Sequence, residues 1–306
     1  MSSAASPEVA FVGLGNMGAG MSASLAKKGI SVTGFDLRPE PVEVLVKAGG
    51  KGAKSAAEAA KGKSVLVIMT INDAQAKAIL FNAGTLEALA EGAVVVLTST
   101  ISPDAANALS EAVFKARSDV GFVDAPVSGG TPGAENGTLT IMASGAKAHY
   151  DKAKPVLDAM GTKVFHVGER PGQGCSMKAM NQILCGVHLV AAAEALSFAK
   201  ATGIDPELAL EIVKGSAAGS WMLSNRAHRM LEEEPTCYSS VQTWAKDFGI
   251  VLDAARQTGA HLPLSAIAGQ MWYSAMARGQ AVLDDTTIIR QYDFLNGNDL
   301  KDKQKK

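Results

Sequence analysis

The chain has 306 residues, of which 47% are hydrophobic and 19% charged, a composition typical of globular proteins that excludes a disordered chain. The formal net charge is −1, so no overall positive field exists to attract nucleic acid or an anionic membrane. The length suggests two packed domains, and the expected partners are small molecules or further copies of the chain.

Seven strands are predicted, and in the first half of the chain they alternate with Ala/Lys/Glu-rich helical segments. Continuous apolar strands separated by helices predict a parallel sheet covered on both faces, because parallel strands need crossovers that lie on those faces. The predicted strands are 8–13, 31–36, 64–69, 93–100, 121–126, 138–145 and 163–168.

After Gly168 the sequence becomes rich in Ala, Leu, Met, Glu and Lys, and no convincing strand follows. The segment GERPGQG, from Gly168 to Gly174, is typical of a hinge that leads into a helix, which we expect from about Pro171 to Ala201. The predicted fold class is therefore α/β. A parallel-sheet domain (1–168) is joined by this long interdomain helix to an all-α domain (169–306).

The cysteines and the start of the chain favour the cytoplasm. Cys175, Cys185 and Cys237 are an odd number without the spacing of a metal site or a disulfide framework. The N-terminal residues lack the basic start and apolar core of a signal peptide. No uninterrupted apolar stretch approaches the ~20 residues of a membrane span, so we expect no membrane contact.

A glycine-rich turn, GLGNMG, connects the first strand to a helical segment. In this context Gly13 permits the tight turn, Gly15 lets the backbone approach a pyrophosphate, and Gly18 lets the helix pack closely on the strand. The N-terminus of the helix adds free N–H groups. The sequence therefore predicts a Rossmann-type domain whose dinucleotide contacts are Gly13, Leu14, Gly15, Asn16, Met17 and Gly18.

The second strand ends at Asp36, where a carboxylate can bind the adenosine ribose hydroxyls. The same carboxylate would repel a 2′-phosphate, which favours NAD over NADP. Arg38 leaves the alternative open, since it could bind a 2′-phosphate, lie over the adenine or be a solvated surface residue. NAD is the predicted cofactor, with NADP the less favoured choice.

Three further stretches resemble the β-hydroxyacid dehydrogenase family, which includes 3-hydroxyisobutyrate, tartronate semialdehyde, glyoxylate/succinic semialdehyde and threonate enzymes. The resemblance runs along nearly the whole chain. Residues 122–145, FVDAPVSGGTPGAENGTLTIMASG, resemble the substrate loop. This implies that Ser128, Gly129 and Gly130 hold the substrate carboxylate, as a hydroxyl and two unobstructed N–H groups can. Taken alone, Ser-Gly-Gly is more often an ordinary turn.

Residues 172–182, GQGCSMKAMNQ, resemble the family's GxxxKxxN element, with Gly174, Lys178 and Asn181 at the matching positions. Lys178 and Asn181 are three apart on a predicted helix and share one face. When hydride leaves an alcohol carbon, the hydroxyl proton must leave too. The resemblance implies that Lys178 takes this proton and that Asn181 orients the hydroxyl or the ammonium. Gln182 departs from the family, which often has a second Asn here.

The stretch WAKDFGIVLD resembles the element that carries a second lysine, here Lys246, to the nicotinamide or the substrate. Alone, Lys246 and its neighbour Asp247 would be an exposed charged pair. The same resemblance implies that Met69 and Thr70, after the third strand, and Thr100, after the fourth, line the cofactor. Ligands bind at these carboxyl ends in open α/β sheets.

The stretches 219–231 and 262–272 resemble the threonate dehydrogenase branch. The predicted function is hydride transfer between NAD and the hydroxyl-bearing carbon of a small hydroxy acid, such as the four-carbon acid L-threonate. The expected enzyme is a homodimer or homotetramer without a metal. The alternatives are the other activities of the family, an imine reductase, and a non-catalytic NAD-binding module. Lys178 argues against an imine reductase, and the presence of Lys178, Asn181 and Lys246 together argues against a non-catalytic module.

Overall fold

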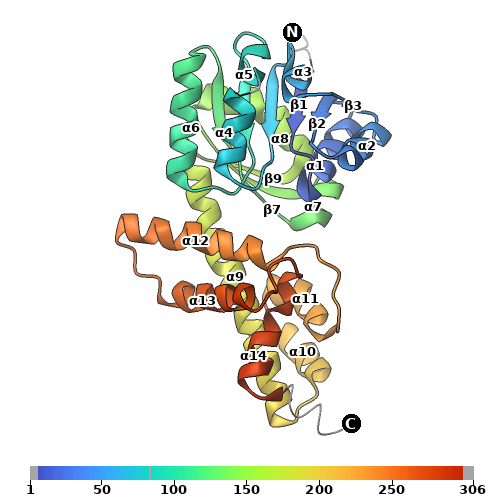
Figure 1. Ribbon diagram of the computed structural model, residues 1–306, viewed down its shortest axis with the longest axis vertical. Helices are drawn as coiled ribbons and strands as arrows, with labels where there is room; N and C mark the ends of the chain where they lie inside the picture. Colours follow the sequence, from blue (N-terminus) through green and yellow to red (C-terminus); the bar gives the residue numbers. More distant parts are fainter. Residues whose placement is uncertain (1–5, 83, 299–306) are drawn as a thin grey trace. The chain divides into compact units, whose positions relative to one another are not determined.

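A computed structural model describes residues 6–82 and 84–298, which belong to two compact units (Figure 1). The first unit extends to Lys178 and the second begins at Ala179, so the chain passes from one to the other within a single long helix. The boundary between residues 168 and 169 stays a prediction. Each unit is described by itself below.

Within the described residues, the first unit contains a nine-stranded sheet in the order β3-β2-β1-β4-β5-β6-β8-β7, with β9 beside β8. The strands β1 to β6 are parallel to one another, and β9 is parallel to β8. The strands are β1 Glu8–Val12, β2 Ser31–Phe35, β3 Lys51–Gly52, β4 Val65–Ile68, β5 Val94–Leu97, β6 Gly121–Asp124, β7 Val127–Ser128, β8 Leu139–Ser144 and β9 Gly161–Gly168.

β8 departs from the wholly parallel sheet that the sequence predicts, since it runs antiparallel to both β6 and β7. A parallel connection needs a crossover of a dozen or more residues. The segment between β7 and β8 holds only the short helix α7 (Gly130–Asn136). β3 and β7, of two residues each, are too short to leave an apolar pattern in the sequence.

Side chains that alternate along each strand supply two separate cores, one on each face of the sheet. On β1, Val9 and Phe11 pack on one face, and Ala10 and Val12 on the other. The first face is covered by α1, α2, α7 and α8 and the second by α3, α4, α5 and α6, which surround the sheet in Figure 1. These helices are α1 Asn16–Lys27, α2 Pro39–Lys47, α3 Ala56–Ala60, α4 Asp73–Phe81, α5 Thr85–Ala88, α6 Pro103–Ala116, α7 Gly130–Asn136 and α8 Lys147–Met160.

The strand order reverses at β1, whose neighbours are β2 on one side and β4 on the other. Such a reversal is the place where open α/β sheets bind ligands, at the carboxyl ends of the strands. The predicted α/β fold class, with a Rossmann-type domain followed by a helical domain, is confirmed.

The described part of the second unit, residues 179–298, consists of helices apart from one isolated bridge between Ser240 and Asp284. Its core contains Phe248 and the stacked rings of Trp244 and Trp272, whose centroids are 5.6 Å apart. The helices are α9 Gln173–Thr202, α10 Pro206–Lys214, α11 Trp221–Arg226, η1 Ala227–Leu231, α12 Val241–Thr258, α13 Pro263–Ala277, η2 Asp285–Ile288 and α14 Ile289–Leu295.

Among the described residues, α9 alone is long and apolar enough to cross a membrane, with a mean hydropathy of 1.5 in its most apolar window. The sequence predicted this helix but, because the membrane test relied on uninterrupted apolar runs, did not identify it as long and apolar enough to cross a membrane. Half of that window is buried, and Leu189, Ala193 and Leu196 pack in the core of the helical unit. A core helix passes the same test of length and composition.

Candidate active site

The glycine turn after β1 has two positions closed by packing and one that is open. Gly13 has a φ of 91°, which favours glycine, and a Cβ added there would lie 2.2 Å from the carbonyl oxygen of Met69. A Cβ on Gly18 would lie 2.0 Å from the carbonyl oxygen of Gly13. At Gly15 the nearest described atom is Nη2 of Arg38, at 3.6 Å. The backbone at Gly15 is therefore open to the close approach of a group such as a phosphate.

Helix α1 begins at Asn16, within the GLGNMG stretch, with Gly15 as its N-cap residue. Glycine has no side chain to accept a hydrogen bond from the first N–H groups, and no acidic residue lies in the first turn. The first N–H groups of a helix carry the positive end of its dipole. This end of α1 therefore suits an anionic phosphate.

Asp36 follows β2, and its carboxylate bonds the backbone of the glycine turn. Its Oδ2 accepts a hydrogen bond from the N–H of Leu14 at 2.7 Å, and its Oδ1 accepts one from the N–H of Arg38 at 3.0 Å. The Arg38 Nε lies 3.6 Å from Oδ1, although most of the Arg38 side chain is exposed. The ion pair holds the guanidinium close to the carboxylate and to the open face of Gly15.

The residues expected along the cofactor lie at the ends of the neighbouring strands. The N–H of Met69 donates to the carbonyl of Val12 at 3.0 Å, which fixes the chain after β4 against the end of β1. The N–H of Thr70 donates to Ser99 Oγ at 2.8 Å, and the two hydroxyls are 3.0 Å apart. Thr100 comes next after Ser99. Ser99 was not predicted from the sequence, and it ties the ends of β4 and β5 together.

The predicted substrate loop, residues 122–145, includes β7, α7 and β8, and its Ser-Gly-Gly portion lies at the end of β7. Ser128 pairs with Thr140 of β8, and Gly129 and Gly130 have φ values of 137° and 65°. Both values lie in the region that strongly favours glycine. A Cβ on Gly129 would also lie 3.1 Å from Leu139 Cδ2. The backbone of this loop therefore requires the Gly-Gly pair, whatever the loop binds.

Two buried side chains, Asp124 of β6 and Ser144 of β8, hold the start of α9. Asp124 accepts hydrogen bonds from the N–H groups of Gly172 at 3.0 Å and Cys175 at 2.9 Å, and from the Ser144 hydroxyl at 2.5 Å. Ser144 Oγ accepts the N–H of Gly174 at 2.9 Å. We call Asp124 and Ser144 the α9 clamp. It bonds N–H groups that the helix itself leaves without partners.

The α9 clamp explains the glycine of the GxxxKxxN element. A Cβ on Gly174 would lie 2.4 Å from the carbonyl oxygen of Met142 and 2.9 Å from Asp124 Oδ2. Burial raises the pKa of the Asp124 carboxyl above its usual value, although the hydrogen bonds from Ser144, Cys175 and Gly172 oppose this shift. The sequence reasoning missed Asp124, but an aspartate inside an apolar strand was a usable signal, since buried carboxylates are rare unless paired.

Lys178 lies on α9 one turn beyond the clamped N–H group of Cys175 and is only 6% exposed. Lysines are seldom so buried without a partner. Asn181 is three residues further along the same helix, and Gln182 beside it is 8% exposed. The predicted proton-transfer lysine therefore lies largely out of solvent.

In the helical unit, Asn181 and Lys246 are connected through two residues. Asn181 Nδ2 donates to Gln182 Oε1 at 3.0 Å, and Gln182 Nε2 donates to Asp247 Oδ2 at 2.6 Å. The Lys246 ammonium lies 3.1 Å from Asp247 Oδ1. Lys246 and Asp247 are therefore not an exposed pair: Asp247 is 4% exposed and the Lys246 side chain 28%.

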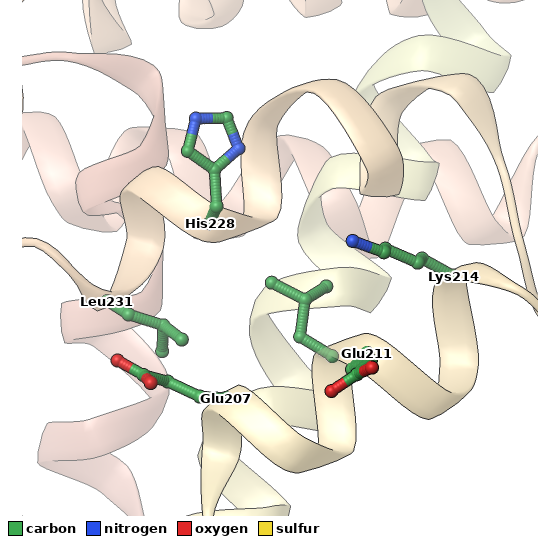
Figure 2. Close-up of a pocket in the computed structure, with 6 residues that line it drawn as sticks. Glu207, Glu211, Lys214, His228 and Leu231 are labelled. Carbon is green, nitrogen blue, oxygen red and sulfur yellow. The ribbon is translucent and has the colours of Figure 1, made fainter.

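A separate hollow of about 320 Å³ lies in the helical unit between α10 and η1, and none of the residues that line it is a predicted site residue. Figure 2 shows the imidazole of His228 directed away from the carboxylates of Glu207 and Glu211. These side chains are exposed, and no group of His, Cys, Asp and Glu suited to a metal occurs within residues 6–82 and 84–298.

Comparisons with known proteins assign both parts of the chain. Residues 8–168 match the NAD binding domain of 6-phosphogluconate dehydrogenase. Residues 172–292 match the domain described as NAD-binding of NADP-dependent 3-hydroxyisobutyrate dehydrogenase. An L-threonate dehydrogenase from Cupriavidus necator is 38% identical over 93% of this chain and 96% of its own. The chain belongs to the β-hydroxyacid dehydrogenase family. It is an NAD-dependent hydroxyacid dehydrogenase.

Two further dehydrogenases are similar to the chain over nearly its whole length, and a more distant structure shares its fold. An NAD-dependent L-serine dehydrogenase from Pseudomonas aeruginosa is 34% identical over 95% of this chain and 99% of its own. A solved 3-hydroxyisobutyrate dehydrogenase from Salmonella typhimurium has a TM-score of 0.87 and 37% identity, covering 92% of this chain and 99% of its own. An imine reductase from Myxococcus stipitatus, at 18% identity and a TM-score of 0.65, shares the fold.

Proposed function

We propose that this dehydrogenase oxidises L-threonate, with NAD as the hydride acceptor. The observation that carries this proposal is the similarity to L-threonate dehydrogenases, five of which, from four bacterial species, are 36–38% identical over 92–97% of the chain. The L-serine and 2-(hydroxymethyl)glutarate dehydrogenases that also match are less similar, at 34% and 31%.

Each residue of the proposed active site has a separate task. NAD, when bound, accepts the hydride from the hydroxyl-bearing carbon. Lys178 receives the hydroxyl proton as this carbon is oxidised and returns it in the reverse direction. Asn181 orients the hydroxyl. The loop formed by Ser128, Gly129 and Gly130 binds the carboxylate through its hydroxyl and N–H groups.

Burial and anchoring support the assignment of Lys178. Its 6% exposure means that solvent competes little for the ammonium. The α9 clamp fixes the N–H groups of Gly172, Gly174 and Cys175, immediately before Lys178 on the helix. A proton-transfer group needs such fixed geometry, since an error of about 1 Å can cost about a hundredfold in rate.

The cofactor contacts that we propose come from the ends of four adjacent strands and from α12. Asp36 would bind the ribose hydroxyls and oppose the 2′-phosphate of NADP, so NADP should be the poorer cofactor. Lys246 would contact the nicotinamide or the substrate. The turn residues would bind the phosphates and the residues after β4 and β5 would line the cofactor: Gly13, Leu14, Gly15, Asn16, Met17, Gly18, Met69, Thr70 and Thr100.

We also propose that the enzyme is a cytoplasmic homodimer or homotetramer. Large apolar side chains of the helical unit that are at least half exposed support self-association, among them Leu184 and Phe198 of α9 and Leu264 and Ile267 of α13. Light scattering of the purified protein should give the mass of two or four chains. A monomer at micromolar concentration would refute this part.

The substrate is tested by assaying the purified protein with NAD and a panel of acids. L-threonate should have the highest kcat/KM, and 3-hydroxyisobutyrate, L-serine and 2-(hydroxymethyl)glutarate should be poorer. A single pocket contact changes selectivity by ~1–3 kcal/mol, so the preferred acid should stand out by about tenfold or more. Turnover of 3-hydroxyisobutyrate without turnover of L-threonate would reject the proposed substrate.

The role of Lys178 is tested by Lys178→Ala, which should lower kcat by about 10²–10⁴-fold and leave the Kd for NAD unchanged. Lys163→Ala, at an exposed position on β9, is the matched control and should behave as wild type. Unchanged turnover in Lys178→Ala would remove Lys178 from the mechanism.

A further inference from the structure

Gln182 and Asp247 are buried polar residues next to two proposed active-site residues. Gln182 follows Asn181 on α9, and Asp247 follows Lys246 on α12. Both are more than nine-tenths buried, and Gln182 Nε2 donates to Asp247 Oδ2 at 2.6 Å. A buried amide and a buried carboxylate that bond each other are costly to separate, because each would then lack a partner.

Lys246, Asp247, Gln182 and Asn181 form a chain of polar contacts, and the donor and acceptor in each contact follow from the preceding contact. Asp247 forms an ion pair with Lys246, and a carboxylate only accepts hydrogen bonds. The amide group that faces Asp247 must therefore be the NH₂ of Gln182, which leaves Gln182 Oε1 as an acceptor. Of the two ends of the Asn181 amide, only the NH₂ can donate to Gln182 Oε1, and the distance between these atoms is 3.0 Å.

The Asn181 amide is thereby fixed with its Nδ2 turned to Gln182. Nδ2 also lies within donor distance of the Cys185 sulfur, at 3.5 Å, which agrees with the same orientation because a thiol sulfur accepts weakly. The atom that Asn181 keeps for other contacts is the acceptor Oδ1. An acceptor suits a substrate hydroxyl or an ammonium, both of which are donors.

We propose that Asp247, acting through Gln182, is a positioning residue that fixes the Asn181 amide with Oδ1 available to a hydroxyl or ammonium donor. This inference rests on the proposed function, since it assumes that Asn181 meets the substrate. Asparagine in place of Gln182 would be one methylene shorter and would not reach Asp247 in this arrangement.

The central test is a double-mutant cycle on kcat with NAD and L-threonate, or with whichever acid of the panel turns over best. Gln182→Met keeps the length of the side chain and removes both hydrogen bonds, so the Asn181 amide can rotate. It should lower kcat by on the order of tenfold, the equivalent of one hydrogen bond, with the Kd for NAD unchanged. In an Asn181→Ala background, Gln182→Met should have no further effect on kcat.

Each outcome of the cycle decides between the two proposals. An equal loss from Gln182→Met in both backgrounds would show that Gln182 does not act through Asn181, and an unchanged kcat in the wild-type background would overturn the positioning role directly. A normal kcat in Asn181→Ala would instead reject Asn181 as a site residue. The positioning role of Asp247 and Gln182 would then be rejected as well, because it acts through Asn181. The roles of Lys178 and L-threonate would be tested separately by their own assays.

A pH profile gives a readout that a loss of stability would not imitate. Glutamate at position 182 can replace the glutamine only when it is protonated, because only then can it donate to Asp247. The kcat of Gln182→Glu, relative to wild type, should therefore rise as the pH falls. The charged groups near the new carboxyl are Asp247, which bonds position 182, Lys246, which pairs with Asp247, and Lys178, one turn before position 182 on α9. A ratio that does not change with pH would contradict the proposed donation.

The matched control for that profile is Gln291→Glu. Gln291 is 1% exposed in the same helical unit, and its amide bonds Gln280 at 2.8 Å and Ser274 at 3.2 Å, none of which is a proposed site residue. Its relative kcat should not depend on pH. A similar acid-side recovery in this variant would assign the effect to buried charge in general and would overturn the specific role of Gln182.

Discussion

Replacing Ser144 by alanine tests the α9 clamp, because this one hydroxyl makes two buried hydrogen bonds. It donates to Asp124 Oδ1 at 2.5 Å and accepts the N–H of Gly174 at 2.9 Å. A bond to a charged group contributes about 1.5–3 kcal/mol, and a buried N–H without a partner costs about 1–3 kcal/mol. Ser144→Ala should therefore lower the free energy of unfolding of the first unit by about 3 kcal/mol.

This loss should depend on pH, because Ser144 stabilises the charged form of Asp124. Burial already raises the pKa of Asp124, and removal of the Ser144 bond should raise it further. A carboxyl with a raised pKa contributes most to folding at acid pH, and that contribution is lost as the pH rises through the folded-state value. Ser144→Ala should therefore be more destabilised at pH 7, relative to wild type, than at acid pH.

The assay is urea unfolding at several pH values together with hydrogen exchange of the segment 172–178, which reports the opening of the first turn of α9. Ser22→Ala is the matched control, since Ser22 is also fully buried but donates only to the Ala19 carbonyl of its own helix. A change in Ser144→Ala below about 0.5 kcal/mol, within the range of ordinary surface substitutions, would refute the clamp as a stabilising contact.

Three further predictions concern the nucleotide turn, the choice of cofactor and the helical unit. Gly15→Ala should fold normally and weaken NAD binding by tenfold or more in a calorimetric titration, and a normal NAD affinity would contradict the pyrophosphate site. Gly18→Ala should lower the free energy of unfolding by about 1–3 kcal/mol in thermal unfolding, because its Cβ would overlap a backbone oxygen. Asp36→Ala should raise the KM for NAD and lower that for NADP, and an unchanged ratio of kcat/KM values would reject its role. Burial raises the pKa of Asp285 to about 6, so its contribution to stability should be lost as the pH rises from about 4 to 7, by up to about 3 kcal/mol. In urea unfolding, Asp285→Asn should reduce the change of the free energy of unfolding with pH between about pH 4 and 7. An unchanged pH dependence would contradict the assignment to Asp285.

The sequence predicted the parts of the fold that depend on local patterns. Continuous apolar runs placed the long strands, and the glycine turn between β1 and α1 identified the domain type. The antiparallel course of β8 could not be predicted in this way, since it depends on pairing between segments distant in the chain. The length of α9 as a continuous apolar helix was anticipated, but its resemblance to a membrane span was not.

In the candidate site, too, local sequence patterns were predictable and contacts between distant segments were not. Motif spacing and the family resemblance supplied Lys178, Asn181 and Lys246, because these residues lie in short recognisable stretches. The contacts that hold the helices of these residues were missed, although Gln182 and Asp247 lie within the recognised stretches. Asp124 and Ser144 are 20 residues apart and meet only because β6 pairs with β8. Gln182 and Asp247, 65 residues apart, meet only through the packing of α9 and α12.

The α9 clamp also determines where the polypeptide can be shortened. A fragment that stopped at residue 168 would contain Asp124 and Ser144 without the three N–H groups that they bind. A buried carboxylate would then keep only a hydroxyl donor, and such a fragment should express poorly or aggregate. A recombinant nucleotide-binding fragment should therefore retain the opening turns of the following helix.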